Sequence, residues 1–334
     1  MRAYNEGLKW NRRRAGNGEA AGMKQIKSAT LIGLGAMGAF FTPGLQKVLG
    51  DDFRVMADGQ RKKRLEQGVT INGEDYRLSI VEPGEHTGPA DLVIIAVKDY
   101  ALEEALRQVA NQVGPDTILL PVLNGLSCAR QTGAVYGMDK VLYASMWVAS
   151  SMENGVAHFD TQRGLIRFGE ARNDVWSDRM KALADLFDRA GIRYSVEPDM
   201  LRCLWVKFMG NVSENLPCAL LGVPYGTYRP GSEADAIRKA LMAEVAAVAK
   251  AEAGVEITEA DRAARDQVTY GQNPANRPST LQDLERGKKT EVDLFAGAMV
   301  ELGKKHGIPT PYSELMLHGI RVREEKNAGT IPGL

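Results

Sequence analysis

The stretch SATLIGLGAMG, residues Ser28–Gly38, is a short apolar strand pattern that runs directly into glycines with GxGxxG spacing. In such a loop, Gly33 permits the tight turn out of the strand, Gly35 lets the backbone approach a pyrophosphate, and Gly38 lets the next helix pack close to the strand. A helix expected from about Ala36 points its positive N-terminus at the phosphates. The motif alone is weak, because the chain holds 35 glycines, so its surroundings must decide. The predicted loop consists of Gly33, Leu34, Gly35, Ala36, Met37 and Gly38.

The charges after the second predicted strand bear on which dinucleotide this loop would take. That strand, Phe53 to Ala57, ends in Asp58, 20 residues past Gly38, where a dinucleotide fold places the group that reads the adenosine ribose. An acid there accepts hydrogen bonds from the ribose hydroxyls of NAD and repels the 2′-phosphate of NADP. Arg61 heads a basic run that is placed to pair a 2′-phosphate, but such a run is equally typical of a solvated helix start.

Two polar residues follow further strand patterns of the same half. DLVIIAV, residues 91–97, is apolar almost throughout, as a strand buried on both faces should be, and it ends at Lys98. Another buried run, residues 117–123, ends at Asn124. Ligands of open α/β sheets bind outside the carboxyl ends of the strands, so we expect Lys98 and Asn124 to contact cofactor or substrate. Residues 69–81 are predicted to form an inserted hairpin that turns at Asn72-Gly73.

The character of the sequence changes near Pro198. Before it, strands are expected at residues 164–168 and 193–196, with a helix over 178–190; after it, long helices are expected, for example over 234–253 and 292–305. We therefore predict a dinucleotide-binding domain over residues 23–197 and a helical substrate domain over 198–334. Residues 1–22 carry five basic against two acidic residues and no apolar run, and are predicted to be a disordered leader rather than a signal peptide.

The first helix of the second domain carries a polar stripe. Lys207, Asn211 and Asn215 recur at i, i+4 and i+8, which places them within roughly 80° of one another on an α-helix. Such a stripe presents one ammonium and two amides to a substrate, although a solvated helix face would have the same pattern. Pro217 is expected to kink or end the helix just after the stripe.

Composition excludes several classes of function. The 334 residues carry 42 Lys+Arg and 42 Asp+Glu, so there is no basic excess for nucleic acid, and no apolar stretch is long enough to span a membrane. Three cysteines without a CxxC pair and four scattered histidines offer no metal site, and they suit free thiols in a reducing cytosol. We thus expect a cytoplasmic protein with no metal, nucleic-acid or membrane partner.

Five separated pieces together resemble one family. They are GLGAMG at Gly33–Gly38, AVK ending at Lys98, LNG around Asn124, LWVKFMGNVSEN at Leu204–Asn215, and the stretch from PSTLQDL at Pro278 to TEVD at Asp293. Over residues 24–326, the chain resembles the 2-dehydropantoate 2-reductases, also called ketopantoate reductases. The resemblance implies an α/β fold in which a Rossmann-type dinucleotide-binding sheet precedes an all-helical C-terminal domain, as in 6-phosphogluconate dehydrogenase.

The resemblance also implies roles for individual residues. Lys207 would be the catalytic lysine and general acid, with Glu291 as its acidic partner. The implied substrate-binding residues are Asn211, Asn215 and Ser279, and the implied cofactor-side contacts are Lys98 and Asn124. The implied reaction is reduction of 2-dehydropantoate to pantoate by NADP(H), a step of pantothenate biosynthesis, and a homodimer is plausible. One departure is Asp58, which stands where many members carry an arginine for the 2′-phosphate; it leaves NAD(H) open unless Arg61 or Lys62 compensates.

Three alternatives stay open from the sequence. The same fold and lysine would serve a reductase for another 2-oxo acid, or an opine-type dehydrogenase that condenses a 2-oxo acid with an amine. A protein that senses NAD(P) without turning it over is disfavoured, because a pure sensor has no use for the set Lys207, Asn211, Asn215, Ser279 and Glu291.

Overall fold

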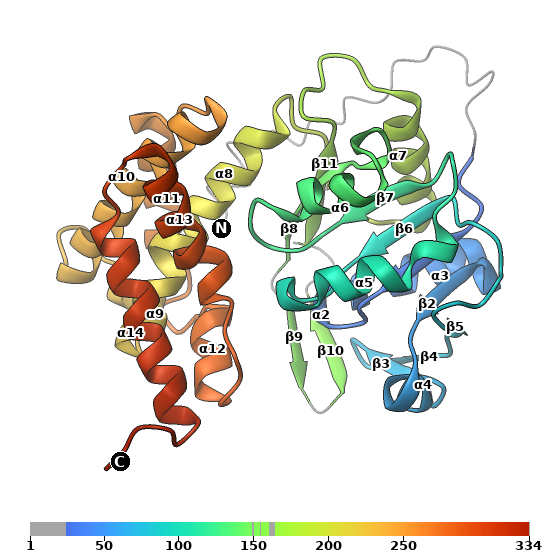
Figure 1. The fold of residues 1–334 in the computed structure, drawn as a ribbon, viewed down its shortest axis with the longest axis horizontal. Helices are drawn as coiled ribbons and strands as arrows, with labels where there is room; N and C mark the ends of the chain where they lie inside the picture. Colours follow the sequence, from blue (N-terminus) through green and yellow to red (C-terminus); the bar gives the residue numbers. More distant parts are fainter. Residues whose placement is uncertain (1–24, 149, 154, 160–163, 334) are drawn as a thin grey trace. The chain divides into compact units, whose positions relative to one another are not determined.

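A computed structural model describes residues 25–148, 150–153, 155–159 and 164–333. The leader expected over residues 1–22 lies outside the described residues. The chain divides after Met200 into two compact units, a mixed α/β unit and a helical unit (Figure 1). No helix in the described part of the chain is long and apolar enough to cross a membrane.

A five-stranded parallel sheet forms the centre of the first unit. Its order is β5-β2-β1-β6-β7, and its strands are β1 (Ala29–Ile32), β2 (Phe53–Met56), β5 (Ser79–Val81), β6 (Leu92–Ile95) and β7 (Ile118–Pro121). Ala29 of β1 pairs with Phe53 of β2 on one side and with Leu92 of β6 on the other. The chain therefore builds outward from β1 to β5 and returns to β6 on the opposite side. That reversal between β1 and β6 is the switch point at which open α/β sheets bind ligands.

Helices cover both faces of this sheet, which explains its apolar strands. In β6, Leu92 and Ile94 join the core under α3 (Thr42–Leu49) and α7 (Asp178–Ala190), whereas Val93 and Ile95 join the core under α5 (Leu102–Gln108) and α6 (Cys128–Tyr136). Successive strand residues point to opposite faces, so a strand covered on both sides must be apolar at every position. The predicted helix over 178–190 is confirmed as α7, which begins at the cap Ser177 and ends at Gly191 with φ 66°.

Two expectations for this unit need correction. The expected hairpin turns at Asn72 (φ 50°) and Gly73 (φ 85°), and it joins β3 (Val69–Ile71) to β4 (Glu74–Tyr76). However, β5 leaves the hairpin and pairs in parallel with β2, because its Ile80 and Val81 help to cover the core. The helix expected as one piece after the glycine loop is two, α2 (Ala36–Ala39) and α3, and α3 starts afresh with a proline in its first turn.

Two smaller sheets complete the unit. One has the order β4-β3-β10-β9, with β9 at Ser150–Glu153 and β10 at Val156–Phe159. The other has the order β12-β11-β8, with β8 at Tyr143–Trp147, β11 at Leu165–Gly169 and β12 at Tyr194–Ser195. The strands expected at 164–168 and 193–196 are thus present as β11 and β12, whereas the sequence signalled none of β8, β9 and β10.

The helical unit is organised around its longest described helix, α10 (Glu233–Ala253). α10 contacts α13 (Ala298–His306), α14 (Pro311–Asn327) and the turn that follows α8 (Met200–Gly210). The remaining helices are α9 (Leu216–Leu221), α11 (Glu259–Tyr270) and α12 (Ser279–Glu285). Glu244 of α10 accepts hydrogen bonds from Tyr312 N at 2.7 Å and Ser313 N at 2.9 Å. It therefore satisfies the free N–H groups at the start of α14 and joins the two helices.

Two π-helical turns interrupt the helices of this unit. The turn η5 covers Asn211–Asn215 between α8 and α9, and the turn η7 covers Asp293–Gly297 just before α13. The kink or end expected at Pro217 is replaced by η5, after which helix continues as α9 with the proline in its first turn. Proline has no N–H to donate to the carbonyl four residues earlier, so a wider turn just before it avoids losing a regular α-helical bond.

Candidate functional site

The glycine loop after β1 has the geometry that its three glycines predict. Gly33 has φ 97°, and a Cβ there would lie 2.6 Å from the Ala96 carbonyl carbon, so only glycine fits where the loop passes the end of β6. A Cβ on Gly38 would lie 2.2 Å from the Gly33 oxygen. A Cβ on Gly35 would meet no protein atom within 4 Å. The missing side chain of Gly35 is therefore not needed for packing, and it leaves room for a ligand's phosphates.

Asp58 lies at the carboxyl end of β2, where the ribose of a dinucleotide is expected. It is exposed and occupies the cap position of α4 (Gly59–Leu65), but its side chain makes no capping hydrogen bond. Partial burial and the neighbouring Arg64 lower the pKa of Arg61, while Asp58 raises it, so these charges lie close together. Lys62 instead pairs with Glu82 at 3.2 Å. Asp58 thus has the position to accept ribose hydroxyls, and Arg61 rather than Lys62 is the neighbouring cation.

Lys98 and Asn124 follow adjacent strands of the sheet. Lys98 is exposed and comes three residues after β6, whose Ile95 pairs with Pro121 of β7; Asn124 is half-buried and follows β7. Because Gly33 packs on Ala96, the loop after β6 borders the glycine loop. The structure therefore brings the predicted cofactor residues of this unit to one edge of the sheet.

Two amides of the polar stripe meet at the π-helical turn. Asn215 Nδ2 donates to Asn211 Oδ1 at 3.4 Å, and Asn215 is buried while Asn211 is half-buried. A π turn advances each residue through less than the 100° of an α-helix, so residues four apart lie more nearly in line than the sequence stripe assumed. Lys207 is half-buried on α8, four residues before Asn211.

A buried ion pair lies within the same turn. Glu214 is 0% exposed, and both of its carboxylate oxygens accept hydrogen bonds from the guanidinium of Arg265 on α11. Thr269 Oγ1 adds a hydrogen bond of 2.7 Å. A Cβ on Gly210 would lie 2.7 Å from Arg265 Nη2, so glycine makes room for the guanidinium. Sequence reasoning missed this pair; the signal available was the acid inside the apolar stretch of NVSEN.

The other two predicted residues lie on elements that contact this turn. Ser279 is the exposed first residue of α12, and Glu291 is a half-buried residue whose carbonyl accepts from Phe295 N at 3.2 Å as η7 begins; α12 and η7 both contact η5. The backbone before Glu291 is anchored, because Thr290 N and Oγ1 both donate to Glu324 at 2.7 Å. The structure thus gathers Asn211, Asn215, Ser279 and Glu291 on neighbouring elements of the helical unit.

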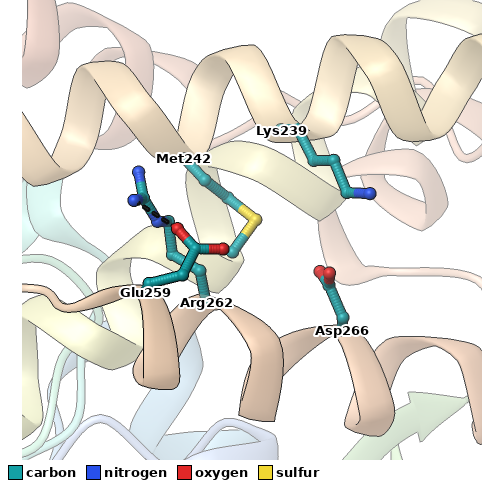
Figure 2. Close-up of a pocket in the computed structure, with 5 residues that line it drawn as sticks. All are labelled: Lys239, Met242, Glu259, Arg262 and Asp266. Atoms are coloured by element: carbon teal, nitrogen blue, oxygen red, sulfur yellow. Dashed lines mark hydrogen bonds and ion pairs between the residues drawn. The ribbon is translucent and has the colours of Figure 1, made fainter.

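A separate recess lies between α10 and α11 (Figure 2). It has a volume of about 180 Å³ and is lined by Lys239, Met242, Glu259, Arg262 and Asp266. Its charges are paired within the protein: Arg262 binds Glu259 at 2.6 Å, Lys239 binds Asp235 at 3.0 Å, and Asp266 binds the buried Arg238. None of the predicted site residues lines it, and its internal pairing explains it as a junction between two helices.

Metal and thiol chemistry find no support in the part of the chain that the structure describes. Within it, no group of three or more His, Cys, Asp or Glu side chains is placed to hold a metal ion. Cys128, Cys203 and Cys218 are all buried and free. Burial raises the pKa of Cys218 to about 11, which makes it a poor nucleophile near neutral pH.

Comparison with known proteins gives consistent matches for both units. The family model described as "Ketopantoate reductase PanE/ApbA" matches residues 29–173, and the model described as "Ketopantoate reductase PanE/ApbA C terminal" matches residues 199–324. The chain is 29% identical over 240 residues to 2-dehydropantoate 2-reductase of Aquifex aeolicus (strain VF5), a match that covers 70% of this chain and 76% of that protein.

Solved structures match over nearly their whole length. A PanE/ApbA family ketopantoate reductase from Ralstonia eutropha JMP134 has a TM-score of 0.76 and 25% identity, covering 90% of this chain and 99% of that chain. The ternary structure of D-mandelate dehydrogenase with NADH and anilino(oxo)acetate has a TM-score of 0.80 and 23% identity, with the same two coverages. At such identity the second match shows a shared fold.

Proposed function

Since the chain belongs to the ketopantoate reductase family, a family of oxidoreductases, we propose that it reduces the ketone of a 2-oxo acid to a 2-hydroxy acid with NAD(P)H, and that 2-dehydropantoate is its substrate. The observation that carries the proposal is the pair of amides at Asn211 and Asn215, in contact with each other four residues after Lys207. Ser279 and Glu291 lie on elements that contact the same turn. A small polar acid needs such a group of donors and acceptors.

The glycine loop fits a dinucleotide, because Gly35 presents bare backbone with space beside it. Gly33 to Gly38 would hold the pyrophosphate, and Lys98 and Asn124 would contact the rest of the cofactor. When bound, the nicotinamide supplies the hydride. The protein's own residues supply position and charge.

Lys207 has the role of general acid in this proposal. Negative charge develops on the ketone oxygen as it is reduced, and an ammonium beside it stabilises that charge and donates the proton. Glu291 would orient the lysine or a substrate hydroxyl. Asn211, Asn215 and Ser279 would pair the substrate's remaining polar groups, so that analogues lacking those groups leave buried polar atoms unpaired and are rejected.

Asp58 supports NADH as the preferred cofactor. Its carboxylate is exposed and is not used to cap α4, so it is available to the ribose hydroxyls. The same carboxylate repels a 2′-phosphate, and Arg61, the neighbouring cation, is itself close to it. This differs from the NADP(H) preference that the family resemblance implied, and a direct comparison of the two cofactors decides between them.

The experiment follows oxidation of NADH and NADPH at 340 nm with 2-dehydropantoate, a branched 2-oxo acid and 2-oxo-2-phenylacetate, each with and without an added amine. Turnover of 2-dehydropantoate with the highest kcat/KM supports the proposal. Faster turnover of another acid transfers the proposal to that substrate, and turnover that requires the amine indicates an opine-type dehydrogenase. Cofactor binding without oxidation for any acid would refute catalysis and favour a sensor.

A further inference from the structure

The side-chain amide of Asn215 is held from two directions. Tyr225 Oη donates to Asn215 Oδ1 at 2.8 Å, and Asn215 Nδ2 donates to Asn211 Oδ1 at 3.4 Å. Tyr225 lies in the 3₁₀ turn η6 (Tyr225–Thr227), outside the helix that carries the asparagines. An amide has one accepting and one donating end, so a donor at its oxygen determines where its N–H groups point.

The direction of the Tyr225 hydrogen bond follows from its surroundings. Burial raises the pKa of the Tyr225 hydroxyl above its ordinary value, the charge of Glu214 adds to that rise, and a hydrogen bond with the side chain of Gln272 opposes it. The phenol therefore stays protonated at any physiological pH. A bond that lowers a phenol's pKa is one that donates to its oxygen, so Gln272 is the donor there. The phenol's single proton is left for Asn215.

This arrangement assigns the orientation of both amides. With its oxygen bound to Tyr225, Asn215 turns its NH₂ group to Asn211, and Asn211 must present its own oxygen in return. The NH₂ group of Asn211 is then the end that faces away from Asn215. Among the described residues, Asn211 Nδ2 donates to no protein group.

We propose that Tyr225 is a positioning residue which, through Asn215, fixes Asn211 as a hydrogen-bond donor to an oxygen of the substrate. The inference rests on the proposed function, because the carboxylate and ketone oxygens of a 2-oxo acid are acceptors only. An amide turned the other way would present its oxygen to those oxygens and weaken binding. Tyr225 does not itself need to touch the substrate.

The turn that carries Tyr225 is fixed by backbone contacts. Tyr225 N donates to Asn276 O at 2.9 Å, and Gly226 N donates to Pro274 O at 2.8 Å. A Cβ on Gly226 would lie 2.9 Å from the Pro274 side chain, so a glycine permits this close approach. The phenol is thus held in place before substrate arrives, which is what preorganisation of a binding group requires.

The test is Tyr225→Phe. We expect KM for the 2-oxo acid to rise about tenfold, in line with loss of a well-placed hydrogen bond to a charged group, with kcat changed less than threefold and dinucleotide affinity unchanged. The matched control is Tyr270→Phe, which removes a hydroxyl that donates to Asp235 Oδ2 at 2.8 Å in the same unit. That variant should leave KM unchanged.

A double-mutant cycle tests whether Tyr225 acts through Asn215. Asn215→Ala should raise KM, and Tyr225→Phe in the Asn215→Ala background should change it by less than about twofold. Asn215→Asp is a second variant, since it keeps an acceptor for Tyr225 but loses the donor to Asn211; it should also raise KM. Additive effects of the two single changes, or an unchanged KM in Tyr225→Phe, would overturn the inference alone. A wild-type chain that oxidises neither cofactor with any 2-oxo acid would refute the proposed function first.

Discussion

Replacement of Glu214 by glutamine should destabilise the helical unit far more than its small change in shape suggests. Glu214 is 0% exposed and binds Arg265 with both oxygens, and the Arg265 side chain is itself 13% exposed. Removing one member of a buried pair leaves the other charge uncompensated, which typically costs about 3–5 kcal/mol. Glutamine can still accept one hydrogen bond from Arg265 and one from Thr269, so we expect a loss of about 3 kcal/mol, at the lower end of that range.

Thermal unfolding followed by far-ultraviolet circular dichroism measures this loss. About 3 kcal/mol corresponds to a fall in Tm of roughly 10 °C for a unit of this size. The matched control is Glu285→Gln, which makes the same change in a pair with Arg277 at the surface of the same unit, where 46% and 36% of the two side chains are exposed. A surface pair contributes about 0–1 kcal/mol, so Tm should barely move.

A paired replacement separates charge from packing. Glu214→Leu together with Arg265→Met removes both charges, and such apolar replacements of a buried pair are often neutral or stabilising. We expect the double variant to recover most of the Tm lost in Glu214→Gln. If Glu214→Gln lowers Tm no more than Glu285→Gln does, the buried pair is not a stabilising feature and this reasoning is wrong.

Three further changes test the site. Gly35→Ala should leave Tm unchanged, because its Cβ would meet no protein atom within 4 Å, yet weaken dinucleotide binding at least tenfold by titration calorimetry; unchanged affinity would mean that the loop does not approach the phosphates. Lys207→Ala should reduce kcat about 10²- to 10⁴-fold with dinucleotide affinity kept, and more than a tenth of wild-type turnover would exclude it as the acid. Asp58→Arg should raise the NADPH/NADH ratio of kcat/KM, and an unchanged ratio would show that Asp58 does not read the ribose.

Much of the first unit was predictable from local pattern. The apolar run of Leu92–Ile95 and the glycines at 33, 35 and 38 each signal their structure within a few residues, and both match the described sheet and loop. The strand at Ser79–Val81 was assigned to a hairpin because its partner, β2, lies more than twenty residues earlier in the chain. Pairing with a distant strand leaves no mark in the alternation of neighbouring residues.

The helical unit shows where periodicity stops being sufficient. A stripe counted at 100° per residue treats the stretch from Lys207 to Asn215 as one uniform α-helix, and no apolar pattern distinguishes five π-helical residues from α-helical ones. Pro217 was the one local signal of irregularity, and it indicated the right place but the wrong form. Tyr225 could not be assigned at all, because its contact with Asn215 depends on a turn held by residues 274–276.

The turn at Asn211–Asn215 sets the rotational phase of the helix that follows it. A π turn contains in effect one more residue than an α turn, so deleting a single residue there would restore regular α-helical bonding and rotate everything downstream by about 100°. Leu216, Cys218 and Ala219, each 0% exposed, would then swing away from the interior. Segment length here is therefore as constrained as residue identity, and a one-residue deletion should be more damaging than most substitutions in the same stretch.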